Sequence, residues 1–173
     1  YYYNFGLEIE WKPVPQIEFE IQPQYEFSHS KYQWGTSYED DLAASTFGKR
    51  YVFATIDHET FSAEMRLNWS FSPKISLQLY LQPFFTVGNY TQFKELAKPN
   101  SMDYNVYGRN GSTISYNEGD SEYTVDADGN GPAAAETFND PNFNFKSIRG
   151  NVVLRWELLP GSVFYLVWTH DKI

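Results

Sequence analysis

The 173-residue sequence predicts an all-β fold, namely an antiparallel transmembrane β-barrel of which about eight strands are visible. Apolar and polar residues alternate over ten residues or more in several segments, as in β-strands with one apolar face and one polar, water-facing face. These segments exceed the usual strand of about 5–6 residues and suit the roughly 9–11 residues that cross a bilayer at a tilt. Aromatic residues form 19% of the chain and need a large apolar surface to contact.

The first part of the chain predicts three strands. Tyr1–Trp11 alternates and then meets Lys12-Pro13-Val14-Pro15, where the chain must turn because proline cannot donate to a strand ladder. Gln16–Phe27 follows, with Gln or Glu at every even position. Ser28-His29-Ser30 predicts a turn, and Tyr32–Tyr38 predicts a shorter strand.

The middle of the chain repeats this pattern after a polar connection. Arg50–Ile56 predicts a strand and Asp57–Glu59 a tight turn. Thr60–Phe71 is the cleanest amphipathic strand, with Phe, Ala, Met, Leu and Trp at its odd positions. Ser72-Pro73-Lys74 then predicts a turn into the strand Ile75–Val87.

The last part predicts one long loop and a final hairpin. From residue 88 to residue 144 the alternation is lost, and we interpret this stretch as the long external loop of a single barrel domain covering 1–173. Lys146–Leu158 and Ser162–His170 predict two more strands, joined by Leu159-Pro160-Gly161. With eight strands, all the proline-containing turns fall at one end of the sheet.

Composition excludes several classes of function. The formal net charge of -9 makes nucleic acid an unfavourable partner, because phosphate binding needs clustered Lys and Arg. The absence of cysteine removes disulfides, thiol catalysis and cysteine-based zinc sites. No apolar run approaches 18 residues, so no helical membrane span is predicted, whereas a barrel with a wet lumen is compatible with a mean hydropathy of -0.53.

The two strand faces predict two sets of site residues. Charged residues of both signs should line the lumen and be held by ion pairs: Glu18, Glu20, Glu64, Arg66, Arg149, Arg155 and Glu157. Aromatic residues near the proline-containing turns should form a girdle at the lipid interface: Trp11, Trp69, Phe71 and Trp156. An alternative is that Glu8, Glu10, Glu18 and Glu20 supply paired carboxylates for glycoside cleavage.

A candidate calcium loop lies inside the long loop. Asp126, Asp128 and Asn130 alternate before Gly131, as in the first half of an EF-hand loop, and would be the metal ligands. The expected Glu at the twelfth position is absent, because Thr137 stands there. A solvated turn stabilised by side-chain to backbone hydrogen bonds explains the same residues.

Several short motifs give the chain a resemblance to an uncharacterised family of Gram-negative outer-membrane proteins. They are Arg50-Tyr51-Val52-Phe53-Ala54, Ser76-Leu77-Gln78-Leu79-Tyr80, Gln82-Pro83-Phe84, Gly88-Asn89-Tyr90, Phe93-Lys94-Glu95-Leu96, Asp140-Pro141-Asn142-Phe143-Asn144-Phe145, Arg149-Gly150-Asn151, Leu154-Arg155-Trp156-Glu157, Pro160-Gly161-Ser162 and Val167-Trp168. The resemblance covers roughly residues 48–170. It implies a C-terminal β-barrel that follows a periplasmic carbohydrate-binding module similar to family nine, and at least one closing strand outside this sequence. It transfers no catalytic residue.

These observations predict a non-enzymatic protein of the bacterial outer membrane. It would act as a passage, an anchor or a scaffold, with the lipid bilayer, and further envelope proteins or glycans, as partners. The alternative is a soluble β-sandwich that binds or hydrolyses polysaccharide. The sandwich requires a second sheet to bury Ile17, Phe19, Phe61, Leu67 and Leu77, whereas the barrel leaves them facing lipid.

Overall fold

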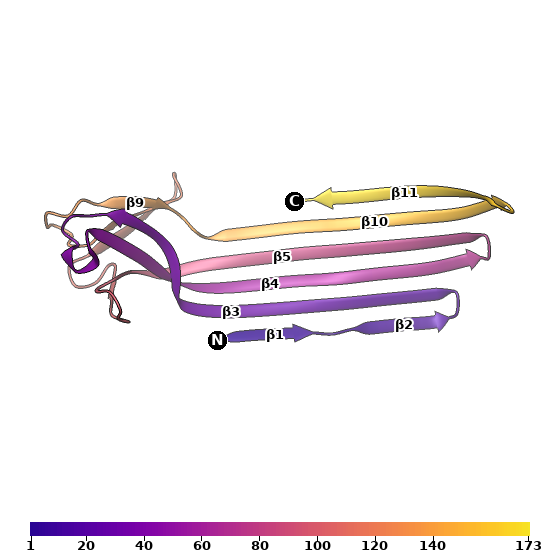
Figure 1. Ribbon diagram of the computed structural model, residues 1–173, viewed down its shortest axis with the longest axis horizontal. Helices are drawn as coiled ribbons and strands as arrows, with labels where there is room; N and C mark the ends of the chain where they lie inside the picture. Colours follow the sequence, from indigo (N-terminus) through magenta and orange to yellow (C-terminus); the bar gives the residue numbers. More distant parts are fainter. The chain divides into compact units, whose positions relative to one another are not determined.

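The computed structural model describes residues 1–173 and is all-β, as predicted. Its only helical element is a single 3₁₀ turn at Ala44–Thr46, and no helix is long and apolar enough to span a membrane. The strands, labelled in Figure 1, are β1 (Tyr2–Gly6), β2 (Ile9–Val14), β3 (Ile17–Glu39), β4 (Lys49–Ser72), β5 (Ile75–Leu96), β6 (Tyr104–Val106), β7 (Thr113–Asn117), β8 (Glu122–Asp126), β9 (Glu136–Asn139), β10 (Phe143–Leu159) and β11 (Ser162–Lys172).

The strands form two antiparallel sheets. The main sheet has eight strands in the order β1-β3-β4-β5-β10-β11, with β2 also paired to β3 and β6 paired to β5. The second sheet has the order β7-β8-β9. Within this chain the main sheet is open, because β11 lies at one edge and β1 and β2 lie at the other. The antiparallel all-β prediction is therefore confirmed, while a closed cylinder is not observed.

Two predicted turns are wrong. Ser28-His29-Ser30 lies inside β3, which runs on to Glu39, and Asp57–Glu59 lies inside β4. These segments pair with neighbouring strands instead of forming turns: the His29 ring contacts the Asp57 carboxylate at 2.6 Å, and the His29 main-chain amide donates to the Tyr1 carbonyl at 2.8 Å. Cross-strand pairing therefore overrides local turn propensity. The main sheet does contain eight strands, but not the eight expected.

The turns at Pro73 and Pro160 are confirmed, whereas the first turn lies later than predicted, because Lys12, Pro13 and Val14 belong to β2. The first predicted strand is broken into β1 and β2, and β2 extends to Val14, so that the turn consists of Pro15 and Gln16. Pro73-Lys74 and Pro160-Gly161 form the other two tight turns. Gly161 has φ +82°, a value suited to the third position of a type II turn, where glycine is preferred.

Residues 88–144, predicted to form one long loop, contain several strands. Strand β5 continues to Leu96, β6 pairs with its end, and β7, β8 and β9 form the second sheet. These strands are three to five residues long, which is too short for alternation to identify them in the sequence.

The chain divides into two compact units. One, the core-bearing unit, comprises Tyr1, His29–Asp57 and Gly88–Phe143. It holds the hydrophobic core cluster, whose buried members are Val52, Ala54, Phe93, Tyr107 and Val125. The other, the single-layer unit, comprises Tyr2–Ser28, His58–Val87 and Asn144–Ile173, and all its strands belong to the main sheet.

The single-layer unit has no hydrophobic core of its own. Ala63 is its only buried hydrophobic residue. The five residues that a sandwich would enclose in a second sheet are not buried: Ile17, Phe19, Phe61, Leu67 and Leu77 are half-buried or exposed. Much of the apolar surface of this unit therefore has no protein partner within the unit.

Candidate functional site

The register of the single-layer unit separates an apolar face from a polar face. Directly opposed residues of an antiparallel pair lie on the same face. In β10 and β11, Val152 opposes Trp168, Leu154 opposes Leu166 and Trp156 opposes Phe164. The intervening pairs include Arg149 with Asp171, Asn151 with Thr169 and Arg155 with Tyr165. Over this stretch the predicted alternation gives one apolar face and one mainly polar face, on which Val153 opposes Val167.

The charged residues predicted for a lumen lie within this unit, and most form ion pairs. Arg66 contacts Glu64 at 3.0 Å, and Arg155 contacts Glu157 at 3.2 Å. Arg149 contacts Asp171 at 3.6 Å. In each same-strand pair the partners are two residues apart, which puts both on one face of the strand.

The glutamates near the first hairpin are held by a lysine that the sequence prediction did not include. Glu10 and Glu20 are register partners. Lys12 forms an ion pair with Glu10 and another with Glu18, the latter at 2.9 Å, while Glu20 accepts a hydrogen bond from Gln22. A carboxylate paired in this way is poorly placed to exchange protons with a substrate, so the arrangement favours a structural role over glycoside cleavage.

The four aromatic residues predicted for a lipid interface are all exposed in the structure. Trp11, Trp69, Phe71 and Trp156 have exposed fractions between 38% and 59%. The rings of Trp69 and Phe71 contact each other with their centroids 4.3 Å apart. Exposed aromatic side chains in such number need an apolar or amphipathic neighbour.

These tryptophans belong to a repeated hairpin motif that alternation alone does not reveal. Each tight turn begins with a proline, and a tryptophan stands four residues before it: Trp11–Pro15, Trp69–Pro73 and Trp156–Pro160. In the first and third hairpins the registers match, since Trp11 opposes Phe19, Trp156 opposes Phe164, and one bulge precedes each turn. The spacing W-x-x-x-P is visible in the sequence, so this signal could have been found there.

Neighbouring hairpins are joined by the same main-chain hydrogen bond. The Ser70 amide donates to the Gln16 carbonyl at 2.8 Å, and the Glu157 amide donates to the Lys74 carbonyl, also at 2.8 Å. In both cases the acceptor is the second turn residue of one hairpin and the donor directly follows the tryptophan of the next. Successive hairpins are therefore offset in the same direction by the same step.

This offset sets the inclination of the tryptophan row. On β2, Trp11 opposes Phe19, the third residue of β3. On β4, the hydrogen bond from the Ser70 amide to the Gln16 carbonyl places Trp69 opposite Ile17, the first residue of β3. The offset of two residues is about 7 Å across two inter-strand spacings of about 4.8 Å each. The row is therefore inclined by about 35° from the perpendicular to the strands, close to the tilt of strands in β-barrels.

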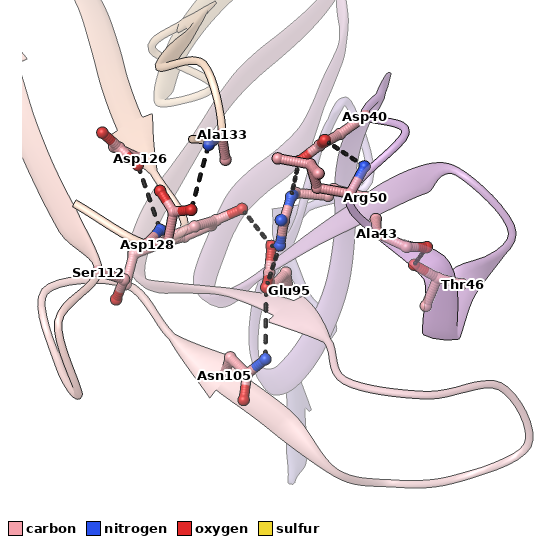
Figure 2. A network of polar contacts seen from close by, with 12 residues as sticks. Asp40, Ala43, Thr46, Arg50, Glu95, Asn105, Ser112, Asp126, Asp128 and Ala133 are labelled. Carbon is pink, nitrogen blue, oxygen red and sulfur yellow. Dashed lines mark hydrogen bonds and ion pairs between the residues drawn. The ribbon is translucent and has the colours of Figure 1, made fainter. Parts of the chain in front are cut away.

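A buried polar cluster lies in the core-bearing unit (Figure 2). Arg50 donates from Nε to Asp40 at 2.6 Å and from a terminal nitrogen to both Glu95 oxygens at 2.7 and 2.9 Å. Glu95 also accepts hydrogen bonds from the Tyr107 hydroxyl at 3.0 Å and the Asn105 amide at 3.3 Å. The Arg50, Asp40 and Glu95 side chains are 14%, 12% and 6% exposed.

The electrostatics of this cluster favour fixed charges. Burial raises the pKa of Asp40, but hydrogen bonds from Arg50 and the Leu42 amide outweigh it and hold that pKa below its ordinary value. Burial, followed by its hydrogen bond to Tyr38 and the nearby Glu95 charge, raises the pKa of Tyr107. Burial lowers the pKa of Arg50, but its hydrogen bonds to Asp40 and Glu95 outweigh this effect and raise that pKa. The lowered pKa of Asp40 and the raised pKa of Arg50 keep this ion pair charged around neutral pH. This suits a structural lock between the segments that carry these residues rather than proton transfer.

The carboxylates of the candidate calcium loop are engaged by backbone amides. Asp126 accepts from the Asp128 and Gly129 amides at 3.2 and 2.9 Å, and Asp128 accepts from the Ala133 amide at 3.1 Å (Figure 2). The structure contains no group of three or more His, Cys, Asp or Glu side chains arranged to hold a metal ion. The local geometry is that of Asx-type turns, and neither it nor Asn130 supports a calcium site.

Comparison with known proteins identifies a family. The sequence matches no curated protein and no solved structure. One family matches residues 2–172, which is nearly the whole chain and includes both compact units. The chain therefore belongs to the family described as Domain of unknown function (DUF5916).

Proposed function

We propose that this chain is part of an outer-membrane β-barrel that serves the bacterial envelope as a passage, an anchor or a scaffold, without enzymatic activity. The single-layer unit would be the membrane-embedded part. Its apolar face would contact lipid, and its charged face would line the lumen.

The observation that carries this proposal is the uncovered apolar face. A soluble sheet of this size needs a second layer, because an exposed apolar patch of more than a few hundred Å² is a liability in water. Here Phe61, Trp156, Leu158 and Leu166 are 41% to 56% exposed, and no second sheet belongs to the unit. Hydrocarbon is the neighbour that accounts for such a face, and this disfavours the soluble sandwich.

The repeated hairpins support the same proposal. When barrel strands tilt by about 35–45° from the membrane normal, a row inclined by that angle from the perpendicular to the strands runs parallel to the membrane plane. Trp11, Trp69 and Trp156 would then lie at one depth, where amphipathic rings favour the headgroup region. The tight turns would face the periplasm, and the long connections of the core-bearing unit would lie outside, as is usual in such barrels.

In this proposal the two sheet edges pair with further strands to close the barrel. All eleven residues of β11 are exposed, and the six consecutive residues Val163–Trp168 are apolar or aromatic. An edge strand of that length presents a row of unpaired N–H and C=O groups that can pair with another strand, and closure of a barrel removes this free edge. A preceding carbohydrate-binding module, which the sequence resemblance implies, would connect the barrel to glycans.

Fractionation combined with tryptophan quenching tests the proposal. The full-length protein is expressed in a Gram-negative host, and its recovery from membranes with and without detergent is measured. Variants that keep only one tryptophan are then reconstituted with lipids brominated on the acyl-chain carbons nearest the headgroup. We expect strong quenching of Trp69 in the single-layer unit and little quenching of Trp34, which is 56% exposed in the core-bearing unit and serves as the control.

Two results would overturn the proposal. One is recovery of the folded protein from the soluble fraction without detergent. The other is equal quenching of Trp69 and Trp34, which would mean that the hairpin tryptophans have no special access to the acyl chains.

A further inference from the structure

A tyrosine-lined groove of about 310 Å³ lies in the core-bearing unit. Residues 90–93 of β5 form one side, and residues of β7 and β8 form the other, with Tyr107 between them in sequence. The lining residues are Tyr90, Thr91, Gln92, Phe93, Tyr107, Ile114, Ser115, Tyr116 and Tyr123. This volume is at the lower end of the roughly 300–1,000 Å³ typical of small-molecule sites.

The lining combines aromatic rings with uncharged polar groups. Four of its nine residues are tyrosines, three more are Thr91, Gln92 and Ser115, and none carries a formal charge at neutral pH. Such a surface offers ring faces for stacking and hydroxyl or amide groups for hydrogen bonds. A phosphorylated or strongly ionic ligand would find no counter-charge in this lining, and the net charge of -9 also disfavours anions.

The rings are held in place before any ligand arrives. Tyr123 contacts Phe93 at 4.6 Å and Tyr116 at 4.7 Å between ring centroids, so the three rings form a continuous surface. The Tyr116 hydroxyl donates to the Asp140 carboxylate at 3.1 Å, while its side chain stays accessible with 44% of the residue exposed. A fixed and accessible ring loses little conformational entropy when a ligand stacks on it.

A strained residue stands in the groove wall. Gln92 has φ +51° within β5, in the left-handed region that non-glycine residues seldom adopt. Strain of this kind costs of the order of 1–3 kcal/mol and is concentrated at ligand-binding sites. It is a second observation, independent of the lining composition, that points to binding at this place.

We propose that this groove binds a neutral saccharide of one or two pyranose units. A pyranose presents C–H groups on its faces, which pack on aromatic rings, and hydroxyls around its edge, which suit Thr, Gln and Ser side chains. The proposal does not depend on membrane insertion, because the groove lies wholly within the core-bearing unit.

The test is a glycan array probed with the purified full-length protein, followed by calorimetry with cellobiose, xylobiose, maltose and chitobiose, and with digalacturonic acid as the acidic counterpart. The critical variant is Tyr116→Ala. Tyr32→Ala is the matched control, since Tyr32 is 46% exposed in the same unit and its ring contacts that of Tyr104 at 5.1 Å between centroids, much as the Tyr116 ring contacts that of Tyr123 at 4.7 Å. Circular dichroism checks that both variants keep the strand content of the wild type.

We expect binding of at least one neutral glycan, weakened about tenfold or more by Tyr116→Ala and unchanged by Tyr32→Ala. Tyr116→Phe, which keeps the ring and loses only the hydroxyl, should bind nearly as well as the wild type. The proposal is overturned if no neutral glycan binds, if only acidic glycans bind, or if both alanine variants bind as tightly as the wild type.

Discussion

Removing the Glu95 carboxylate should locally destabilise the core-bearing unit. Glu95 is 6% exposed and accepts two hydrogen bonds from Arg50 and one each from Tyr107 and Asn105. In Glu95→Leu, Arg50 keeps Asp40 as its counter-charge, so the guanidinium is not left wholly uncompensated. The Tyr107 hydroxyl and one side of Arg50 nevertheless lose a buried acceptor.

The expected magnitude follows from these contacts. Breaking a buried ion pair costs roughly 3–5 kcal/mol, and the remaining Asp40 partner and the recovered desolvation of Glu95 bring the cost to the lower end, about 3 kcal/mol. At 1.4 kcal/mol for each factor of ten, this is a loss of about 100-fold in protection against hydrogen exchange. The amides to follow are Ala97 and Tyr107, which donate to the Asp103 and Phe93 carbonyls.

Two comparison variants make the assay specific. Glu64→Leu removes an ion pair whose Glu64 side chain is 39% exposed, and it should change protection of neighbouring amides by less than about fivefold, because surface pairs contribute about 0–1 kcal/mol. Tyr107→Phe removes one donor and should have an intermediate effect. A loss below tenfold for Glu95→Leu, or an equal loss for Glu64→Leu, would refute the view that this cluster stabilises the unit.

Three other outcomes follow from the core-bearing unit. Gly129→Ala should destabilise it by about 2 kcal/mol or more in chemical denaturation, because Gly129 has φ +71° and a Cβ there would lie 2.3 Å from the Gly111 carbonyl oxygen; Gly48→Ala, with φ +77° and open space, should cost only about 1 kcal/mol. Stability should fall as pH drops through the ordinary Asp40 pKa of 3.8 toward its lowered folded value, since the unfolded carboxyl takes up a proton first, and Asp40→Asn should flatten this dependence in pH-resolved melting. Millimolar calcium or a chelator should leave the melting temperature within about 1 °C, because backbone amides occupy the carboxylates of Asp126–Gly131; a larger rise with calcium would contradict this assignment.

The long strands were predictable because their signal is local. In Thr60–Phe71 residues two positions apart share a sheet face, so the alternation of apolar and polar residues identifies both faces. Pro73 and Pro160 indicate turns because proline has a fixed φ and no N–H to donate. The same local rule failed at Ser28–Ser30, where three polar residues suggest a turn. Their strand conformation depends on partners 28 or more residues away, such as Asp57 for His29.

The candidate sites show the same division. Charge pairs such as Glu64 with Arg66 could be expected, because residues two apart on a strand share a face. The pairing of Arg50 with Glu95 spans 45 residues, and no local pattern indicates it. The groove is further from prediction still, since Tyr90, Tyr116 and Tyr123 come from three strands that only the folded chain brings together.

By itself, the sequence determined the all-β class, the two faces of the long strands and the turns at Pro73 and Pro160, because alternation and proline geometry act over a few residues. The tertiary structure decided where strands continue through polar segments, that residues 88–144 include a second sheet, and which distant residues form the Arg50–Glu95 pair. These features depend on hydrogen bonds and packing between segments far apart in the chain. The stabilising free energy of these contacts is gained only when the distant segments meet, so no local sequence pattern predicts them.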